Sequence, residues 1–316
     1  MNKSQTLLLV VTVAVVAALI GASLYISGAK EDDNLQVVTS FYPLAYMAEE
    51  IGGERVTVKS LIPANTEVHA WQPSPGDIMA ADNADVLLYN GAGLDHWFED
   101  NILSALGPKN RTVVETTHGI ELIEDGHEHE EGTRQDDHDH GDVDPHTWVS
   151  PFIARQQAEN IYKGLVRADP AGESYYAARW KELSSKLNLL DSRYKFELAS
   201  KTNGTVVVAH AAYGYLAHRY GFEMHGVIGM SADQLPSAAA LASLVDLMEA
   251  ENIQTLYVNP IYSDAYVQTL KTELKIRTGN NVQILNLYLM LGPTDGLDYM
   301  GQMEQNLENL KLGLTG

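Results

Sequence analysis

Histidines and carboxylates alternate in the segment from residue 126 to residue 151, which holds five of the eleven histidines in the chain. Four of the five stand in a polar stretch without apolar periodicity, where no packed element is expected: His127, His129, His138 and His140. Imidazole beside carboxylate suits Zn²⁺ and similar divalent cations. Because ordering this stretch costs about 1–2 kcal/mol per residue in backbone entropy, we predict only weak, auxiliary metal binding there.

Three other histidines lie in sequence contexts that favour a fixed position of the side chain. His69 lies in a loop after a predicted strand, and His210 directly follows the apolar run at residues 206–209. His146 stands between a proline and a tryptophan, in the sequence Asp144-Pro145-His146-Thr147-Trp148. In α/β folds, ligands gather at the carboxyl ends of parallel strands. A metal held by all three histidines would lie between two halves of the chain, where ligand pockets commonly form.

The elements before this segment alternate between strand and helix, which predicts a parallel sheet. The predicted strands cover residues 35–41, 54–62, 85–90 and 111–115, and the predicted helices cover residues 42–51, 75–83 and 96–106. Residues 85–90 form an apolar run of the kind found in strands buried on both faces. The first half is therefore predicted to be one α/β lobe.

The pattern starts again after a long helical stretch. Residues 151–167 and 172–200 are predicted to be helical, and the second stretch contains neither Pro nor Gly after its first residue and spans roughly 40 Å. The predicted strands that follow cover residues 205–209, 222–228, 255–258 and 282–287, and the predicted helices cover residues 211–220, 237–251, 263–278 and 298–314. We therefore predict a second α/β lobe, joined to the first by one long helix.

The composition limits the classes of partner and site. Asp and Glu number 42 against 21 Lys and Arg, a formal charge of −21, which disfavours nucleic acid and anionic lipid and attracts cations. The chain has no cysteine, so disulfides, thiolate zinc sites and thiol catalysis are excluded. A zinc site must therefore use His, Asp, Glu or water.

Residues 7–26 form an apolar run that follows Lys3. The run is about as long as the ~20 residues that span a bilayer as a helix, and longer than the apolar part of a signal peptide. We expect an uncleaved N-terminal membrane anchor rather than a cleaved signal that would leave a secreted protein. In both cases the body of the chain is expected outside the cytoplasm, since the positive-inside rule puts Lys3 on the cytoplasmic side and the acidic residues 31–33 on the other.

Ordered motifs along the chain resemble the metal-ion solute-binding proteins of zinc/manganese ABC transporters, over nearly everything after residue 34. The matching segments are residues 39–44 (TSFYPL), 68–75 (VHAWQPSP), 83–94 (NADVLLYNGAGL), 144–148 (DPHTW), 209–216 (AHAAYGYL) and 298–300 (DYM). The resemblance implies two α/β lobes joined by a long rigid helix, with the ion between them. It also implies that His69, His146 and His210 are the metal ligands.

We expect an N-terminal membrane anchor or signal segment at residues 1–33, a first lobe at 34–168 with its His-rich loop at 126–141, a linking helix at 169–203 and a second lobe at 204–316. The ion is expected to be Zn²⁺ rather than Mn²⁺, because His210 stands where manganese-type members have Glu, and imidazole suits zinc better. No carboxylate occupies the family's fourth-ligand position near residues 285–290. Water is the first candidate for that ligand, and Glu67 and Asp295 are the alternatives.

The resemblance implies a monomeric binding protein, not an enzyme, that captures Zn²⁺ and delivers it to a membrane permease driven by an ATPase. Two alternatives stay open. Three histidines and a water also describe a zinc hydrolase, although no His-Glu-x-x-His motif and no general base beside the ligands support it. The other is a Mn²⁺-binding or metal-sequestering, adhesin-like surface protein without a permease.

Overall fold

The computed structural model describes residues 34–124, 143–229 and 236–315, and the chain from Leu35 onward forms one compact unit. The apolar run at residues 7–26 and the four histidines of the His-rich segment lie outside the described residues. None of the helices in the described part combines the length and the apolar character that a bilayer crossing requires.

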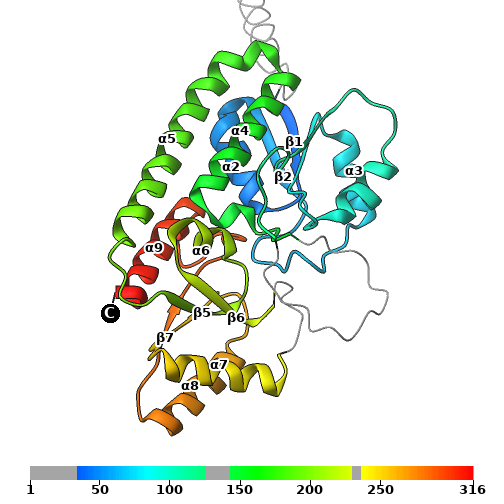
Figure 1. The fold of residues 1–316 in the computed structure, drawn as a ribbon. Helices are drawn as coiled ribbons and strands as arrows, with labels where there is room; N and C mark the ends of the chain where they lie inside the picture. The colour runs from blue at the N-terminus through cyan, green and yellow to red at the C-terminus, as the bar shows by residue number, and fades with distance from the viewer. Residues whose placement is uncertain (1–33, 125–142, 230–235, 316) are drawn as a thin grey trace, which may run out of the picture. The chain divides into compact units, whose positions relative to one another are not determined.

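The first lobe is built on a parallel sheet with the strand order β2-β1-β3-β4. Its strands are β1 (Leu35–Thr39), β2 (Val56–Ser60), β3 (Val86–Tyr89) and β4 (Thr112–Glu115). Every residue of the central strand β3 is buried, as its uninterrupted apolar sequence predicts. Helices α2, α3 and α4 pack against this sheet (Figure 1).

Local sequence explains where the helices of the first lobe begin. They are α2 (Tyr42–Gly52), α3 (Pro75–Asn83) and α4 (Pro151–Ala168), with a 3₁₀ turn at Gly53–Arg55. Each has a proline in its first turn, where the missing N–H would have no hydrogen-bonding partner within the helix. Ser74 and Asp77 form a capping box at the start of α3.

The helix predicted at residues 96–106 is present as a continuous helical segment over residues 96–105, but it is not a regular α-helix. After two α-helical residues it forms a π-helical turn (Phe98–Ile102) followed by a 3₁₀ turn (Leu103–Ala105). Trp97 and Phe98 are both buried at the start of this segment.

The second lobe repeats the arrangement with a parallel sheet in the order β6-β5-β7-β8. Its strands are β5 (Thr205–His210), β6 (Glu223–Ile228), β7 (Thr255–Val258) and β8 (Gln283–Asn286), and its helices are α6 (Gly214–Tyr220), α7 (Ala238–Ala250) and α8 (Ala265–Thr278). A separate apolar cluster lies under α7 and α8, which flank this sheet (Figure 1).

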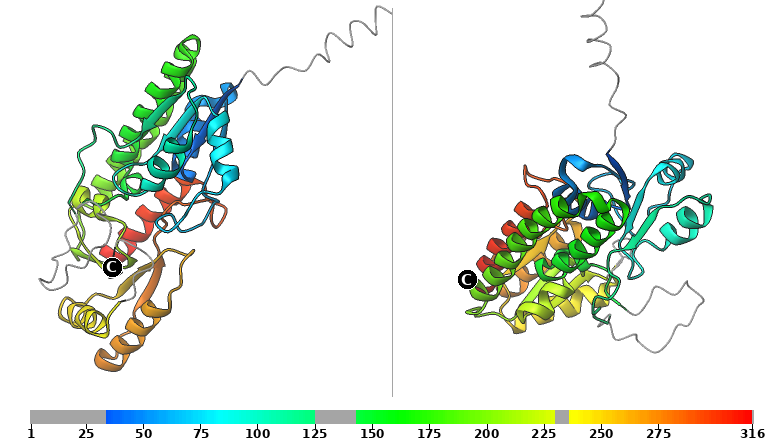
Figure 2. Two further views of the ribbon diagram at one scale, coloured as in Figure 1. Left: turned by 90° about the vertical axis from the view of Figure 1, so that its right-hand side faces the viewer. Right: turned by 90° about the horizontal axis from the view of Figure 1, so that it is seen from above.

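One long helix, α5 (Glu173–Glu197), leads from the first lobe to the second, after a 3₁₀ turn at Pro170–Gly172. Its buried side chains include Leu183, Leu187, Leu190 and Tyr194, which form one stripe along the helix. The last helix, α9 (Tyr299–Thr315), runs beside α5, as both views in Figure 2 show, and Arg193 on α5 pairs with Glu308 on α9. The predicted fold class, two α/β lobes joined by a long helix, is confirmed.

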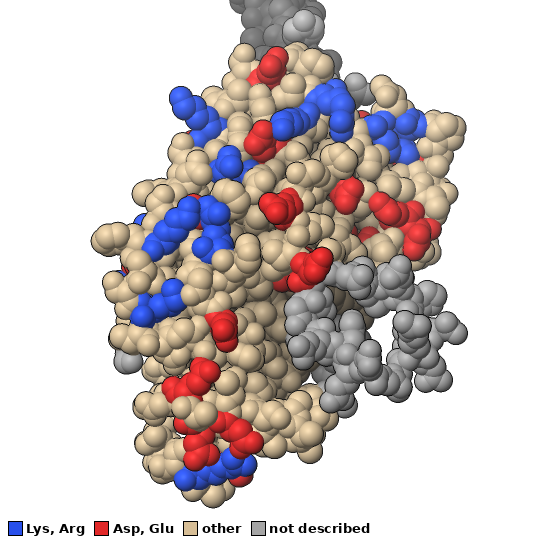
Figure 3. All heavy atoms as spheres, in the orientation of Figure 1, with Lys and Arg blue, Asp and Glu red and all other residues tan. Residues whose placement is uncertain are grey.

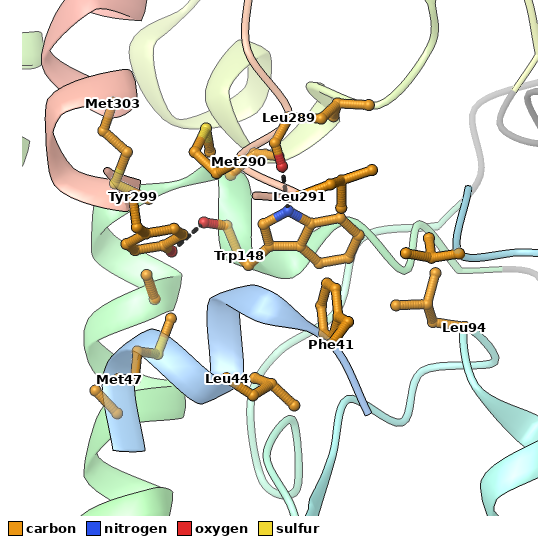
Figure 4. Close-up of a cluster of buried hydrophobic side chains, with 14 of the residues drawn as sticks. Phe41, Leu44, Met47, Leu94, Trp148, Leu289, Met290, Leu291, Tyr299 and Met303 are labelled. Carbon is orange, nitrogen blue, oxygen red and sulfur yellow. Dashed lines mark hydrogen bonds between the residues drawn. The ribbon is translucent and has the colours of Figure 1, made fainter. Parts of the chain in front are cut away.

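The two lobes share one hydrophobic cluster around Trp148, which is fully buried. The indole Nε1 donates to the carbonyl of Leu289 in the second lobe at 2.8 Å, and Tyr299 of α9 donates to the carbonyl of Trp148 at 2.6 Å (Figure 4). Phe41 packs edge-on against the indole, with ring centroids 4.7 Å apart. The segment containing His146 is thus fixed to both lobes.

The surface carries charges of both signs. On the face shown in Figure 3, Lys and Arg are interspersed with Asp and Glu rather than gathered into one continuous basic area. Many of the cations are paired, such as Lys186 with Glu182 and Arg277 with Asp246.

Candidate metal centre

The three predicted histidines come from three different kinds of segment. His69 lies in the loop between β2 and α3. His146 immediately precedes a 3₁₀ turn (Thr147–Val149), and His210 is the last residue of β5. His146 and His210 are only 1% and 4% exposed, whereas His69 is partly exposed. Two of the three are therefore set in the interior, and the third reaches them from a loop.

The structure brings the three imidazoles together. One ring nitrogen from each lies within 4.8 Å of the others. The Nε2 atoms of His69 and His146 are 3.2 Å apart, close to the roughly 3.3 Å expected for two nitrogens bound tetrahedrally to one Zn²⁺. The ring of His210 completes the triangle, with centroids 5.2 Å from His146 and 6.0 Å from His69. Among the described residues, this arrangement can hold one small cation.

Asp144 orients the ring of His146. Its Oδ1 lies 2.8 Å from Nδ1 of His146 and also accepts the backbone N–H of His146 at 2.9 Å. A carboxylate in this place holds the proton on Nδ1 and leaves the lone pair of Nε2 directed at the other two rings.

The second lobe contacts Asp144 directly. Tyr215 of α6 donates to the carbonyl of Asp144 at 2.8 Å, and burial, followed by the negative charge of Asp144, raises the pKa of Tyr215, so that the phenol remains a donor. A Cβ at Gly214 would lie 2.4 Å from Oδ2 of Asp144. Glycine at this position therefore lets α6 approach the carboxylate that orients His146.

Buried amides hold the same segment from the first lobe. Asn90, at the end of β3, donates to the carbonyl of Pro145 at 3.1 Å and accepts from Thr147 at 3.1 Å. Gln157 of α4 donates to the same Asn90 side-chain oxygen at 3.0 Å. The rigid position of His146 thus rests on contacts from both lobes.

Comparisons with known proteins show the family of this chain. Residues 37–313 match the family model of the periplasmic component A of the zinc-uptake complex (ZnuA). The chain belongs to this family. It is 33% identical over 289 residues to the high-affinity zinc uptake system protein ZnuA of Bacillus subtilis, covering 90% of this chain and 89% of that protein.

Two solved structures have a fold similar to that of this chain. Zn(II)-bound AdcA of Streptococcus pneumoniae is 28% identical with a TM-score of 0.73, and the match covers 90% of this chain but only 58% of AdcA. The laminin-binding protein Lmb of Streptococcus agalactiae, described as an adhesin with metal-transporting activity, is 25% identical with a TM-score of 0.77, and the match covers 89% of this chain and 99% of Lmb. The ZnuA family consists of metal-binding transport components rather than enzymes, so the hydrolase alternative is set aside.

Neither carboxylate proposed as a fourth ligand of the ZnuA-family site belongs to the triangle of imidazoles. Both oxygens of Glu67 accept hydrogen bonds: Oε1 from the backbone N–H groups of Val68 and His69, each at 3.0 Å, and Oε2 from the phenol of Tyr262 at 2.5 Å. Oδ2 of Asp295 accepts from Tyr288 at 2.8 Å. In this structure, both side chains have other hydrogen-bonding partners.

Sequence reasoning did not single out Tyr262. Its ring lies edge-on to His210, with centroids 5.8 Å apart, and its hydroxyl reaches Glu67 in the other lobe. Burial, together with the nearby charge of Glu67, raises the pKa of Tyr262 well above its ordinary value. No local pattern marks this tyrosine, because 195 residues separate it from Glu67.

Proposed function

We propose that the protein captures Zn²⁺ outside the cytoplasm, between its two lobes, with His69, His146 and His210 as ligands. The observation that carries this proposal is the triangle of ring nitrogens lying within 4.8 Å of one another. Three imidazoles suit Zn²⁺ better than Mn²⁺, which prefers oxygen ligands. The relatives support the same ion, since one is a zinc uptake system protein and another is AdcA with Zn(II) bound.

The protein then passes the ion to a membrane permease driven by an ATPase, as a component of a zinc-uptake complex. A water molecule as the fourth ligand fits this role, since a site with an open position exchanges its ion more readily than a closed structural one. The apolar run at residues 7–26 would tether the chain to the outer face of the membrane, and the binding protein would work as a monomer.

Zinc competition with a chromophoric chelator tests the ligand assignment. Alanine at His69, His146 or His210 should abolish tight binding, because each substitution leaves only two imidazoles. Alanine at the exposed His118 is the matched control and should leave the affinity unchanged. Retention of tight binding by any one of the three ligand variants would overturn the assignment.

A direct competition between Zn²⁺ and Mn²⁺, with metal analysis of protein purified without added metal, tests the choice of ion. Zinc at ~100 times its dissociation constant should also raise the free energy of unfolding by about 2.7 kcal/mol, and a chelator should reverse this. Preferential loading with manganese would contradict the proposal.

The His-rich segment is proposed as an auxiliary collector of ions. Deletion of residues 127–140 should leave one tight zinc ion per chain and remove only the weak ones. Loss of the tight ion on this deletion would place the principal site in the segment itself.

A surface role in adhesion is a second candidate, favoured by the similarity to Lmb. Binding of the purified protein to immobilised laminin, with and without zinc, tests it. Background binding under both conditions would remove this candidate and leave the transport proposal intact.

A further inference from the structure

The loop that presents His69 belongs to the first lobe by sequence but is bound to the second lobe. Asn65 donates its backbone N–H to the carbonyl of Leu291 at 2.9 Å and its side-chain amide to the carbonyl of Pro293 at 3.0 Å. Thr294 donates to the side-chain oxygen of Asn65 at 3.0 Å. A Cβ at Gly292 would lie 2.8 Å from the backbone nitrogen of Asn65, so this contact depends on the glycine. The start of the loop is therefore attached to the segment before α9.

A second attachment lies two residues before His69. Oε1 of Glu67 accepts the backbone N–H of His69 at 3.0 Å, and Oε2 accepts the phenol of Tyr262 at 2.5 Å. Tyr262 lies in a turn after β7, where its N–H bonds to the carbonyl of Asn259 at 3.0 Å, and its ring packs edge-on against His210. One carboxylate thus connects the backbone of one candidate ligand to the side chain that packs on another.

The position of His69 depends on hydrogen bonds to the second lobe more than the positions of His146 and His210 depend on contacts of that kind. His210 ends a fully buried strand, and His146 is fixed by Asp144 and by its neighbours in the interior. His69 has neither a strand nor a helix around it and is partly exposed. Its ring nitrogen nevertheless lies 3.2 Å from that of His146.

We propose that Glu67 and Tyr262 form a latch between the lobes that holds His69 against His146 and His210, so that opening the latch releases the ion. The proposal rests on the zinc-binding function proposed above and assigns Glu67 a positioning role instead of a ligand role. A hydrogen bond to a charged group is commonly worth roughly 10- to 100-fold in an equilibrium constant. Loss of the latch should therefore weaken zinc binding by about tenfold or more, without removing any ligand.

The test uses Tyr262→Phe, which removes the hydroxyl and keeps the ring against His210. The matched control is Tyr89→Phe, because Tyr89 donates to Glu99 at 2.6 Å in an equivalent phenol–carboxylate bond that lies within the first lobe. Release of zinc into excess chelator is followed by stopped flow, and affinity by competition. We expect release to be roughly tenfold faster in Tyr262→Phe than in the native protein, and unchanged in Tyr89→Phe.

Two further readouts separate positioning from a general loss of stability. The visible spectrum of bound Co²⁺ should shift in Tyr262→Phe towards that of His69→Ala, while Tyr89→Phe keeps the native spectrum. In the double variant Glu67→Gln/Tyr262→Phe, the loss of affinity should be smaller than the sum of the two single losses, because both changes break the same bond. Additive losses would argue against the latch.

The outcomes distinguish the latch from the binding function. If His69→Ala retains tight zinc binding, the proposed site fails. If His69→Ala loses zinc while Tyr262→Phe keeps the native release rate and the native Co²⁺ spectrum, the site stands and the latch is refuted.

Discussion

The carboxylate of Asp144 and the imidazole of His146 form a buried pair, with Oδ1 2.8 Å from Nδ1. Both side chains are almost completely buried, at 4% and 1% exposure. The pair sets the direction of the free ring nitrogen, which faces His69. In the proposed metal site, this pair would therefore act by orienting the ring of His146.

Asp144→Asn should lower zinc affinity by roughly 10- to 100-fold while leaving the three imidazoles in place, because a neutral amide is a poorer acceptor for the Nδ1 proton. Competition with a chromophoric chelator measures the change. Asp77→Asn is the control: Asp77 also accepts a backbone N–H, in the capping box of α3, but has no histidine partner. Equal affinities for the two variants would argue against the orienting role.

Gly214→Ala should disturb the same carboxylate from the second lobe. The added Cβ would lie 2.4 Å from Oδ2 of Asp144, so either the carboxylate or the start of α6 must shift. We expect weaker zinc binding together with a lower melting temperature. A Cβ at Gly204 would meet nothing within 4 Å, so Gly204→Ala serves as the control and should retain native affinity. Native affinity in Gly214→Ala would show that α6 adapts without moving Asp144.

Trp148→Phe should lower the free energy of unfolding by about 2–4 kcal/mol, since it leaves a cavity and removes the donor to the buried carbonyl of Leu289. Urea denaturation measures this loss. Trp180 is only partly buried and stacks on Tyr162, so Trp180→Phe should cost no more than about 1 kcal/mol. A similar decrease in the free energy of unfolding for both variants would mean that the cluster around Trp148 contributes little to the contact between the lobes.

Arg219→Gln should change how stability depends on pH. Burial acts to raise the pKa of Asp191, but hydrogen bonds from Arg219 and Lys195 outweigh it and hold the pKa below its ordinary value. A carboxylate with a lowered pKa stabilises the folded state above its unfolded pKa, near 3.9, and loses that contribution as the pH falls through the folded value. The variant should therefore lose about 3 kcal/mol at pH 7, and the difference from the native protein should shrink towards pH 3.

Arg277→Gln is the control for this measurement. Arg277 pairs with Asp246 and Glu273 on the surface, where ion pairs contribute about 0–1 kcal/mol. Urea denaturation of both variants between pH 3 and pH 7 gives the comparison. A difference for Arg219→Gln that stays constant over this range would exclude Asp191 as its origin.

Local sequence patterns predicted much of the fold because they report local burial. The apolar run at residues 85–90 predicted the fully buried strand β3, and the long stretch free of Pro and Gly after residue 172 predicted α5. At residues 96–106 the same reasoning predicted a helix but not its π-helical and 3₁₀ turns. Helix propensity is a weak guide that tertiary packing modifies, so it does not distinguish these helix types.

The contacts around the candidate metal centre also differ in how far apart in the chain their residues lie. The contact between Asp144 and His146 spans two positions in the chain, so both residues belong to one short motif. The contact between Glu67 and Tyr262 spans 195 positions. Nothing in the neighbourhood of either residue predicts it, since it depends on how the two lobes pack.

By itself, the sequence determined the two-lobed α/β architecture, the lack of thiol chemistry and the three histidines able to share a cation. These follow from residue types and from periodicities that act over a few positions. Only the tertiary structure decided that Glu67 is bound by hydrogen bonds to Tyr262 and to the backbone of His69, and that α6 approaches Asp144 through Gly214. Such contacts depend on side-chain directions and on packing between distant segments, which no local pattern encodes.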